Sequence, residues 1–352
     1  MPRRSSTLPD MEPLNALRRL AEIILADEMP PSSLGPEVEE LGQLVQRYAL
    51  VQLTDQIQTE GESKTAQGLA LSPTMAARCV QDIARTVVFS RGVHRAIQVL
   101  RAQMASRPAR ILYAGCGPYA LLTLCSMAVL KPADLEVTLL DIHEPSIESA
   151  WALLESFGLT EFVSSSVVGD ACAHAVHPNR LPDIILTETM NAALEKEPQV
   201  SIARHLMVQA PDAILLPEAV LIDALLVNPS KEYGFIEYEG DEAGPHEPDR
   251  IHLGTVFELS AATISSWPKK ERSVLPAASV RIPSQVETKY IPALHTTVRV
   301  FGDHVLTVRD SGLTLPKPIA TDGALHGGEL LRFHYRLGPR PCLVCDVSSP
   351  AG

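Results

Sequence analysis

The feature that most constrains the fold of this chain is an alternation of strand-like and helix-like apolar segments that begins at residue 111. Short, mainly apolar runs at 111–114, 136–140 and 167–168 are typical of buried strands. The run at 120–129, between the first two, has an apolar helical pattern. This order predicts an α/β fold with a doubly wound, Rossmann-like sheet, because consecutive parallel strands need helical crossovers between them.

Glycines and acidic residues follow these strands where a doubly wound sheet binds a nucleoside. The first strand breaks into a Gly-x-Gly turn, which lets a ligand approach backbone N–H groups closely. The second ends in Asp141, placed to accept both hydroxyls of a ribose, and the third ends in Asp170, placed to contact an adenine. The third glycine of the dinucleotide fingerprint is missing after Tyr119, which favours S-adenosylmethionine over NAD or FAD. The predicted cofactor residues here are Gly115, Cys116, Gly117, Asp141, Asp170 and Ala171.

Composition excludes several classes of function. The net charge of −12 and the lack of a Lys or Arg block exclude nucleic acid as the partner. Six cysteines lie in apolar surroundings with no signal peptide before them, so we expect a reduced, cytoplasmic protein. No apolar run reaches the roughly eighteen residues that a membrane span needs. Cys342 and Cys345 have metal-like spacing but no second pair, so we predict no metal site.

The chain of 352 residues is long enough for more than one domain. We predict an N-terminal helical region at 1–71, which we hypothesise caps a pocket, a nucleoside-binding domain at 72–217, and a β-rich C-terminal sandwich or small barrel at 218–352. Helical periodicity predicts helices at 14–26, 38–58 and 72–104, and alternation with period two predicts strands at 220–227, 296–301 and 330–335.

A further predicted strand, at 183–187, runs directly into a loop with paired carboxylates. Glu188 follows the strand, Met190 lies two residues on, and Glu197 follows nine residues after the first glutamate. Two carboxylates at the carboxyl end of a parallel strand can converge on one pocket. That geometry suits a cationic, planar group such as a guanidinium. Glu195 is an alternative to Glu197 for the second carboxylate.

These elements together resemble the protein arginine methyltransferases and their small-molecule relatives, over roughly residues 72 to 340. The most specific element is the double-Glu loop with its Met. The resemblance implies that the Asp-x-x-Arg-Thr element opens the cofactor domain, that Arg85 meets the methionyl carboxylate of S-adenosylmethionine, and that the protein is a homodimer. The residues that carry it are Asp82, Arg85, Thr86, Gly115, Cys116, Gly117, Asp141, Glu188, Met190 and Glu197.

The chemistry of a guanidinium explains why two carboxylates are needed. A guanidinium has a pKa of about 13.8 and is a poor nucleophile while its charge is delocalised over three nitrogens. Glu188 and Glu197 can hold it by charge-assisted hydrogen bonds, draw the charge toward the bonded N–H groups, and leave one nitrogen facing the sulfonium methyl. A nearby carboxylate can take the proton released as the product forms.

The chain departs from the family pattern at positions that bear on the choice of substrate. Tyr113 replaces the Asp that usually precedes the Gly turn, and the Thr-His-Trp element of the β-domain is absent, with His295 as the nearest candidate for a substrate contact. We therefore predict an S-adenosylmethionine-dependent N-methyltransferase acting on the guanidino group of free L-arginine or a related small metabolite. The alternatives are methylation of another small biosynthetic intermediate at nitrogen or oxygen, methylation of protein arginine, or a silent scaffold that has lost the cofactor, which Tyr113 and Tyr119 favour.

Overall fold

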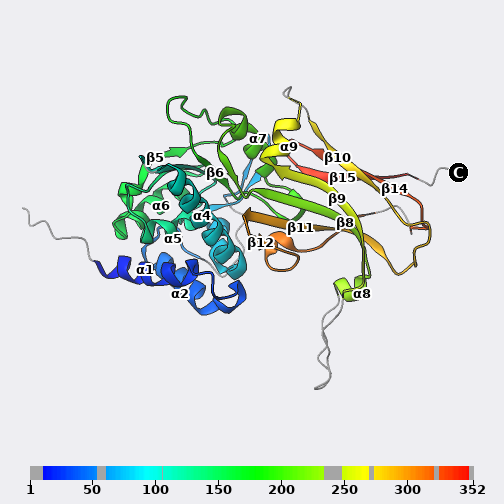
Figure 1. Ribbon diagram of the computed structural model, residues 1–352, viewed down its shortest axis with the longest axis horizontal. Coiled ribbons are helices and arrows are strands. Elements are labelled where there is room, and N and C mark those ends of the chain that lie inside the picture. The colour runs from blue at the N-terminus through cyan, green and yellow to red at the C-terminus, as the bar shows by residue number, and fades with distance from the viewer. Residues whose placement is uncertain are drawn as a thin grey trace, which may run out of the picture.

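The computed structural model describes residues 11–53, 61–104, 106–233, 248–268, 273–320 and 325–348. Figure 1 shows helices wrapped around a parallel sheet on one side and long antiparallel strands on the other. The predicted fold class is confirmed: the protein is α/β, with a doubly wound parallel sheet, an N-terminal helical region and a C-terminal β region. The domain boundaries at 71 and 217 remain predictions.

The helices and strands follow the chain in the order of their labels. The helices are α1 (Met11–Leu25), α2 (Gly35–Tyr48), α3 (Pro73–Ala77), α4 (Ile83–Gln103), α5 (Leu121–Val129), α6 (Glu144–Ser156), α7 (Gln199–Gln209), α8 (Pro229–Glu232) and α9 (Ala261–Ser266). The 3₁₀ turns are η1 (Pro31–Ser33), η2 (Arg78–Gln81), η3 (Thr160–Phe162), η4 (Ala192–Leu194) and η5 (Gly312–Thr314). The strands are β1 (Ser63–Lys64), β2 (Leu69–Ala70), β3 (Ala109–Ala114), β4 (Leu135–Asp141), β5 (Val163–Val168), β6 (Ile184–Thr187), β7 (Ile214–Leu216), β8 (Ala219–Val227), β9 (Arg250–Ser260), β10 (Val274–Arg281), β11 (Ile291–Phe301), β12 (His304–Leu306), β13 (Lys317–Pro318), β14 (Leu330–Arg336) and β15 (Cys342–Ser348).

The parallel sheet has the strand order β5-β4-β3-β6-β7. The chain winds outward from β3 through β4 to β5, and then returns to place β6 on the other side of β3. The order therefore reverses between β3 and β6. In open α/β sheets, ligands bind outside the carboxyl ends of the strands at such a switch point. Ala114 at the end of β3 is paired with Thr187 at the end of β6, so the segments that follow them start side by side.

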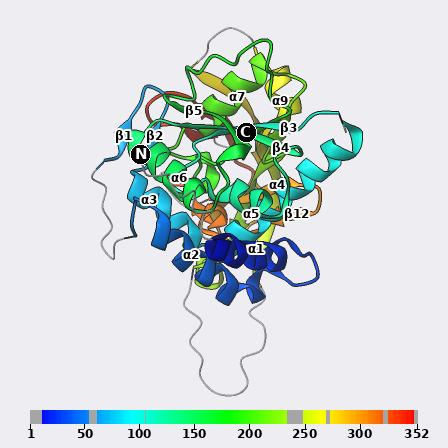
Figure 2. The same cartoon turned by 90° about the vertical axis from the view of Figure 1, so that its left-hand side faces the viewer.

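The N-terminal helices pack on the helical layer that covers this sheet. Figure 2 shows α1 and α2 along the bottom of the molecule, with α1 against α5. The buried Arg91 on α4 fixes them: its guanidinium donates to the carbonyl of Ile24 at 2.8 Å and to that of Met29 at 2.9 Å. Because the orphan carbonyls at a helix end need donors, this side chain both caps α1 and docks it on α4.

Two of the predicted helices differ from the observed ones. The helix predicted at 38–58 ends at Tyr48, because Ala49 turns to an extended conformation; residues 54–58 lie outside the described part of the chain. The helix predicted at 72–104 is interrupted before α4, because Asp82 is extended and acts as the N-cap of that helix. The capping preference of Asp is stronger here than the helical periodicity around it.

The C-terminal half consists of two antiparallel sheets, with strand orders β12-β11-β8-β9 and β10-β14-β15. The strands predicted at 220–227, 296–301 and 330–335 are confirmed as β8, β11 and β14. The core of this half includes Tyr335, whose ring stacks on Phe257 with centroids 4.8 Å apart.

The two halves of the molecule meet closely at one glycine. A Cβ at Gly92 on α4 would lie 2.5 Å from Val300 Cγ1 on β11, so only a glycine allows this approach of helix and strand.

Candidate functional site

A cavity of about 290 Å³ lies at the carboxyl ends of the parallel strands, at the switch point between β3 and β6. Its lining includes the β1–β2 hairpin, residues of α3 and η2, the start of α4, the turns after β3, β4, β5 and β6, and Gly312 and Leu313 of η5. The position is the one that the strand order favours for a ligand.

The Gly-x-Gly turn forms the floor of this cavity. Gly115 has φ of 75° and Gly117 has φ of 62°, a conformation that favours glycine. A Cβ at Gly115 would lie only 2.3 Å from Thr189 Cγ2, so the turn after β3 and the loop after β6 are pressed together. The buried Cys116 lies between the glycines, and its N–H donates to the carbonyl of Leu140 at 3.2 Å. The turn is therefore a tight backbone surface open to a ligand.

Two acidic residues border the cavity where β4 and β5 end. Asp141 is buried, and its two carboxylate oxygens accept the backbone N–H groups of Gly117 and His143, each at 2.9 Å. Because each carboxylate oxygen can accept two hydrogen bonds, capacity remains for ribose hydroxyls. Asp170 accepts the N–H of Cys172 at 2.8 Å, and Ala171 beside it lines the cavity.

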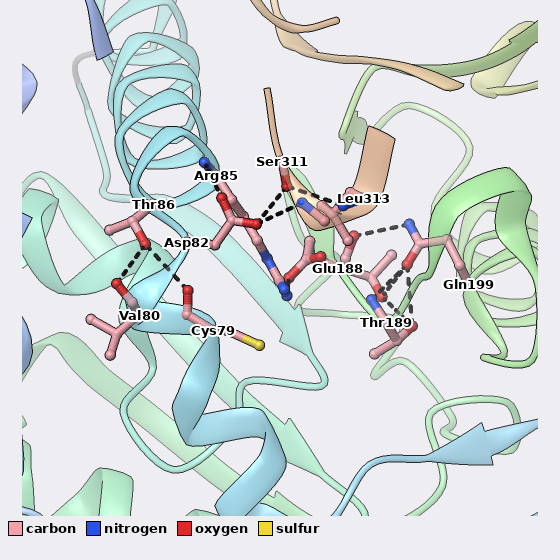
Figure 3. Close-up of polar contacts among 12 residues, drawn as sticks. Cys79, Val80, Asp82, Arg85, Thr86, Glu188, Thr189, Gln199, Ser311 and Leu313 are labelled. Atoms are coloured by element: carbon pink, nitrogen blue, oxygen red, sulfur yellow. Dashed lines mark hydrogen bonds and ion pairs between the residues drawn. The ribbon is translucent and has the colours of Figure 1, made fainter. Parts of the chain in front are cut away.

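Arg85 and Glu188 form an ion pair inside the cavity. The guanidinium Nη2 of Arg85 donates to Glu188 Oε2, and the two side chains are 15% and 5% exposed. Figure 3 shows the Arg85 side chain running from α4 toward Glu188. Among the described residues, Glu188 Oε1 has no hydrogen-bond partner although it is buried. One oxygen of this carboxylate is thus neutralised and the other is left for a ligand.

Asp82 fixes the start of the helix that carries Arg85. Its Oδ1 accepts the backbone N–H of Arg85 at 3.1 Å, so it caps the helix and does not contact the guanidinium. Its Oδ2 accepts the hydroxyl of Ser311 at 2.7 Å and the N–H of Gly312 at 3.0 Å, as Figure 3 shows for Ser311. The same carboxylate therefore holds the η5 wall of the cavity, from the C-terminal half, against α4.

Gln199 braces the segment around Glu188. Its Oε1 accepts the N–H of Thr189 at 2.9 Å, and its Nε2 donates to the carbonyl of Thr187 at 2.9 Å. Gln199 is almost fully buried, at the first turn of α7. Because both residues flanking Glu188 are tied to one buried amide, the direction of the Glu188 side chain is fixed by packing.

Glu197 reaches the cavity through a loop with unusual backbone geometry. Ala193, Leu194 and Lys196 have φ of 58°, 55° and 67°, although none is a glycine. Contacts from the C-terminal half hold this loop: Thr296 Oγ1 accepts the N–H of Ala193 at 2.8 Å, and Tyr335 donates its hydroxyl hydrogen to the carbonyl of Leu194 at 2.7 Å. These bonds stabilise a conformation that L-residues disfavour.

Burial controls the charge of both glutamates. It raises the pKa of Glu188 to about 7, although the Arg85 guanidinium opposes the shift. Burial and then the nearby Glu188 carboxylate raise the pKa of Glu197 to about 8, again opposed by Arg85. Glu197 is 6% exposed, and no hydrogen bond or ion pair joins its carboxylate to another described residue. When both are ionised, the two carboxylates carry more negative charge than the one buried guanidinium beside them can balance.

The structure brings most of the predicted site residues to this cavity. Those that line it are Arg85, Gly115, Cys116, Gly117, Asp141, Asp170, Ala171, Glu188, Met190 and Glu197. Glu195 lies outside it, with its side chain 31% exposed and paired with Lys317 Nζ at 2.7 Å.

His295 also lies outside the cavity. It is buried on β11, with Nε2 3.3 Å from the Glu232 carboxylate, which Arg250 also holds at 2.7 Å. The wall that the C-terminal half contributes is η5, not the segment around His295.

Several residues that shape the site have no clear signal in the sequence. Thr296 and Ser311 act through hydrogen bonds to segments far away in the chain, and Gln199 accepts the N–H of Thr189, ten residues before it. The β1–β2 hairpin lines the cavity, while no described residue of α1 or α2 does. Asp82 differs from these residues, because an Asp directly before a helical run is a recognisable N-cap pattern.

The described residues contain no group of three or more His, Cys, Asp or Glu side chains arranged to hold a metal ion. Cys342 and Cys345 lie on β15, and both are free. In the same part of the chain, no helix has both the length and the apolar character needed to cross a bilayer.

Comparison with known proteins shows the fold. No protein-family model matches the chain, and no curated protein matches it. The Trypanosoma brucei PRMT1 enzyme-prozyme heterotetrameric complex with AdoHcy is similar, with a TM-score of 0.51, 13% identity, and coverage of 78% of this chain and 93% of that one. Arabidopsis thaliana protein arginine methyltransferase 10, in a uniquely open conformation, gives 0.47, 12%, 78% and 93%. At these identities, the first structure supports the same overall fold.

Proposed function

We propose that this protein is an S-adenosylmethionine-dependent N-methyltransferase that acts on a guanidino group. The observation that carries this proposal is the pair of buried carboxylates at the cavity. Glu188 has an oxygen without a partner, and Glu197 has no cation bound to it within the described chain. Buried charges in proteins are normally paired, so a cationic ligand is the expected partner.

The residues around the cavity fit the proposed cofactor. The Gly115–Gly117 turn, Asp141 and Asp170 line one end, where the adenosine would lie, and Arg85 is the guanidinium that would meet its carboxylate. The similar Trypanosoma structure contains AdoHcy, which supports the same choice. When bound, this cofactor supplies an electrophilic methyl group on a sulfonium.

The glutamates of this chain would orient and deprotonate the acceptor. Glu188 and Glu197 can each accept N–H groups of the guanidinium, and together they leave its third nitrogen free to attack. Because a general base works best when its pKa lies near the working pH, Glu197, with its pKa of about 8, suits removal of the proton released on methylation. Arg85 opposes the rise in the pKa of Glu188 and so favours its ionised form.

We propose a free small guanidine, such as L-arginine, as the acceptor. The β1–β2 hairpin supports a small substrate, since it forms one wall of the cavity. The names of the similar structures point instead to arginine in a protein, and this is the second candidate.

Methyl transfer followed by mass spectrometry tests the proposal. Purified protein and S-adenosylmethionine are incubated with free L-arginine or with an arginine-containing peptide. A gain of one methyl on either supports guanidine methylation and tells the two acceptors apart. Glu188→Gln should abolish transfer while the Kd for S-adenosylhomocysteine changes by less than about threefold. Unchanged turnover in this variant would remove the guanidinium clamp, and no transfer to either acceptor by the wild type would refute the proposal.

We further propose that the protein is a cytoplasmic homodimer. All six cysteines lie in the described part of the chain and are free, which supports a reducing compartment. Light scattering of the purified protein tests the assembly, and a monomer at micromolar concentration would contradict it.

A further inference from the structure

The hairpin formed by β1 and β2 is seated directly on the loop that carries Glu197. The N–H of Leu69 donates to the carbonyl of Lys196 at 2.8 Å. A Cβ at Gly68, where φ is 149°, would lie 2.9 Å from both Lys196 O and Pro198 N. Two backbones are therefore in contact here, at a distance that only a glycine allows.

The hairpin is also tied to the opposite side of the cavity. Ser63 Oγ lies 3.0 Å from His143 Nε2, and His143 follows Asp141 at the end of β4. Gln67 accepts the hydroxyl of Ser201, on α7, at 3.3 Å. The hairpin thus spans from the predicted ribose site to the double-Glu loop.

Between these two attachments the hairpin forms a wall of the cavity. Thr65, Leu69, Ala70 and Leu71 all line it. The turn is rigid because Thr65 donates its N–H to the carbonyl of Gly68 at 2.8 Å and accepts the N–H of Gln67 at 3.1 Å. A chain that entered across this wall would have to break the backbone bond to Lys196.

We propose that this hairpin determines substrate specificity by limiting the acceptor to a free small guanidine and excluding arginine within a polypeptide. The inference rests on the proposed function and deepens it. A peptide carries backbone on both sides of its arginine, so its binding requires an open groove at the double-Glu loop. The close contact of Gly68 with Lys196 and Pro198 closes the cavity at the double-Glu loop. A free amino acid needs no groove there.

The contact between the hairpin and the double-Glu loop has a second consequence for the same site. Lys196 has positive φ, and its carbonyl is the acceptor for Leu69. The hairpin therefore stabilises the left-handed residue directly before Glu197, and we expect it to position that carboxylate as well as to close the cavity.

The experiment compares free L-arginine with an arginine-containing peptide as acceptors, using the full-length protein. In Gly68→Ala the new Cβ must move the hairpin away from Lys196 and Pro198. A second variant replaces residues 64–69 by two glycines, since Ser63 and Ala70 are directly paired and a two-residue turn can join them. The control is Gly158→Ala, which also has positive φ (66°) but has no atom within 4 Å of the new Cβ.

The wild type and Gly158→Ala should methylate free arginine and leave the peptide below 1% of that rate, an order-of-magnitude expectation. In both hairpin variants, kcat/KM for free arginine should fall at least about tenfold and the peptide should become a substrate. The inference is overturned if the wild type methylates the peptide as well as free arginine. It is also overturned if variants that still bind S-adenosylhomocysteine keep the wild-type ratio of the two substrates. Failure of the proposed function itself is distinct, because then the wild type methylates neither substrate.

Discussion

Replacing Glu197 by Gln should abolish methyl transfer and yet stabilise the ligand-free protein at alkaline pH. Burial and the Glu188 carboxylate raise the pKa of Glu197 from 4.5 to about 8. In the unfolded chain this group loses its proton near 4.5, whereas in the folded protein it keeps the proton up to about 8. Between these values the folded state binds more protons, so its stability falls as the pH rises.

The size of this effect follows from the pKa difference. At about 1.36 kcal/mol per pKa unit, the shift from 4.5 to about 8 corresponds to an upper limit of about 5 kcal/mol of lost stability above pH 8. A glutamine at position 197 has a similar shape and carries no charge. The free energy of unfolding of Glu197→Gln should therefore exceed that of the wild type by about 2 to 5 kcal/mol at pH 9 and differ by less than about 1 kcal/mol at pH 5.

Urea unfolding of the wild type and the variant at both pH values measures this difference. Glu195→Gln is the matched control, because Glu195 is partly exposed and pairs with Lys317 outside the cavity. An exposed pair contributes little, so the control should change the free energy of unfolding by less than about 1 kcal/mol at either pH. If Glu197→Gln destabilises the protein equally at pH 5 and pH 9, the Glu197 carboxylate has a cationic partner in the fold and the electrostatic reasoning is wrong.

Three further substitutions test how the cavity is built. Gly115→Ala places a Cβ 2.3 Å from Thr189 Cγ2, so we expect the Kd for S-adenosylhomocysteine, measured by calorimetry, to rise at least about tenfold; an unchanged Kd would show that the turn does not contact the cofactor. Gln199→Leu removes the acceptor for the Thr189 N–H, and kcat should fall about tenfold to hundredfold with little change in that Kd; a rise in the Kd alone would contradict a role in positioning Glu188. Thr296→Val leaves the N–H of Ala193 without its acceptor and should lower the free energy of unfolding by about 1 to 3 kcal/mol in urea; no loss would mean that the loop does not depend on this bond.

The part of the site that the sequence predicts is the part that follows from the parallel sheet. Gly115 and Glu188 come directly after a strand, and Asp141 is the last residue of one. Once those strands are parallel and adjacent, their carboxyl ends meet at one edge, so the residues converge whatever the loops do. Period-two alternation likewise predicted the C-terminal strands, because each has one face in a core.

The part that the sequence does not predict depends on contacts between distant segments. A lone histidine, His295, is the candidate that the sequence offers for the wall from the C-terminal half, yet it lies outside the cavity with Nε2 3.3 Å from the Glu232 carboxylate. The actual wall is η5, held by Ser311 through Asp82, and the two residues are far apart in the chain. Neither the serine nor its partner has a pattern that marks this contact, since each also satisfies a local rule, as a 3₁₀ cap and as a helix N-cap.

The double-Glu loop shows why the site needs the whole chain. Residues 192–197 have the local sequence Ala-Ala-Leu-Glu-Lys-Glu, which favours a helix. Three non-glycine residues in this stretch are instead left-handed, at a cost of about 1 to 2 kcal/mol each. The hydrogen bonds that hold them, from Thr296 on β11, Tyr335 on β14 and Leu69 in the hairpin, contribute about 1 kcal/mol each and act only when both other regions are in place. The position of Glu197 therefore depends on the hairpin, the parallel-sheet region and the C-terminal half all being folded around the cavity.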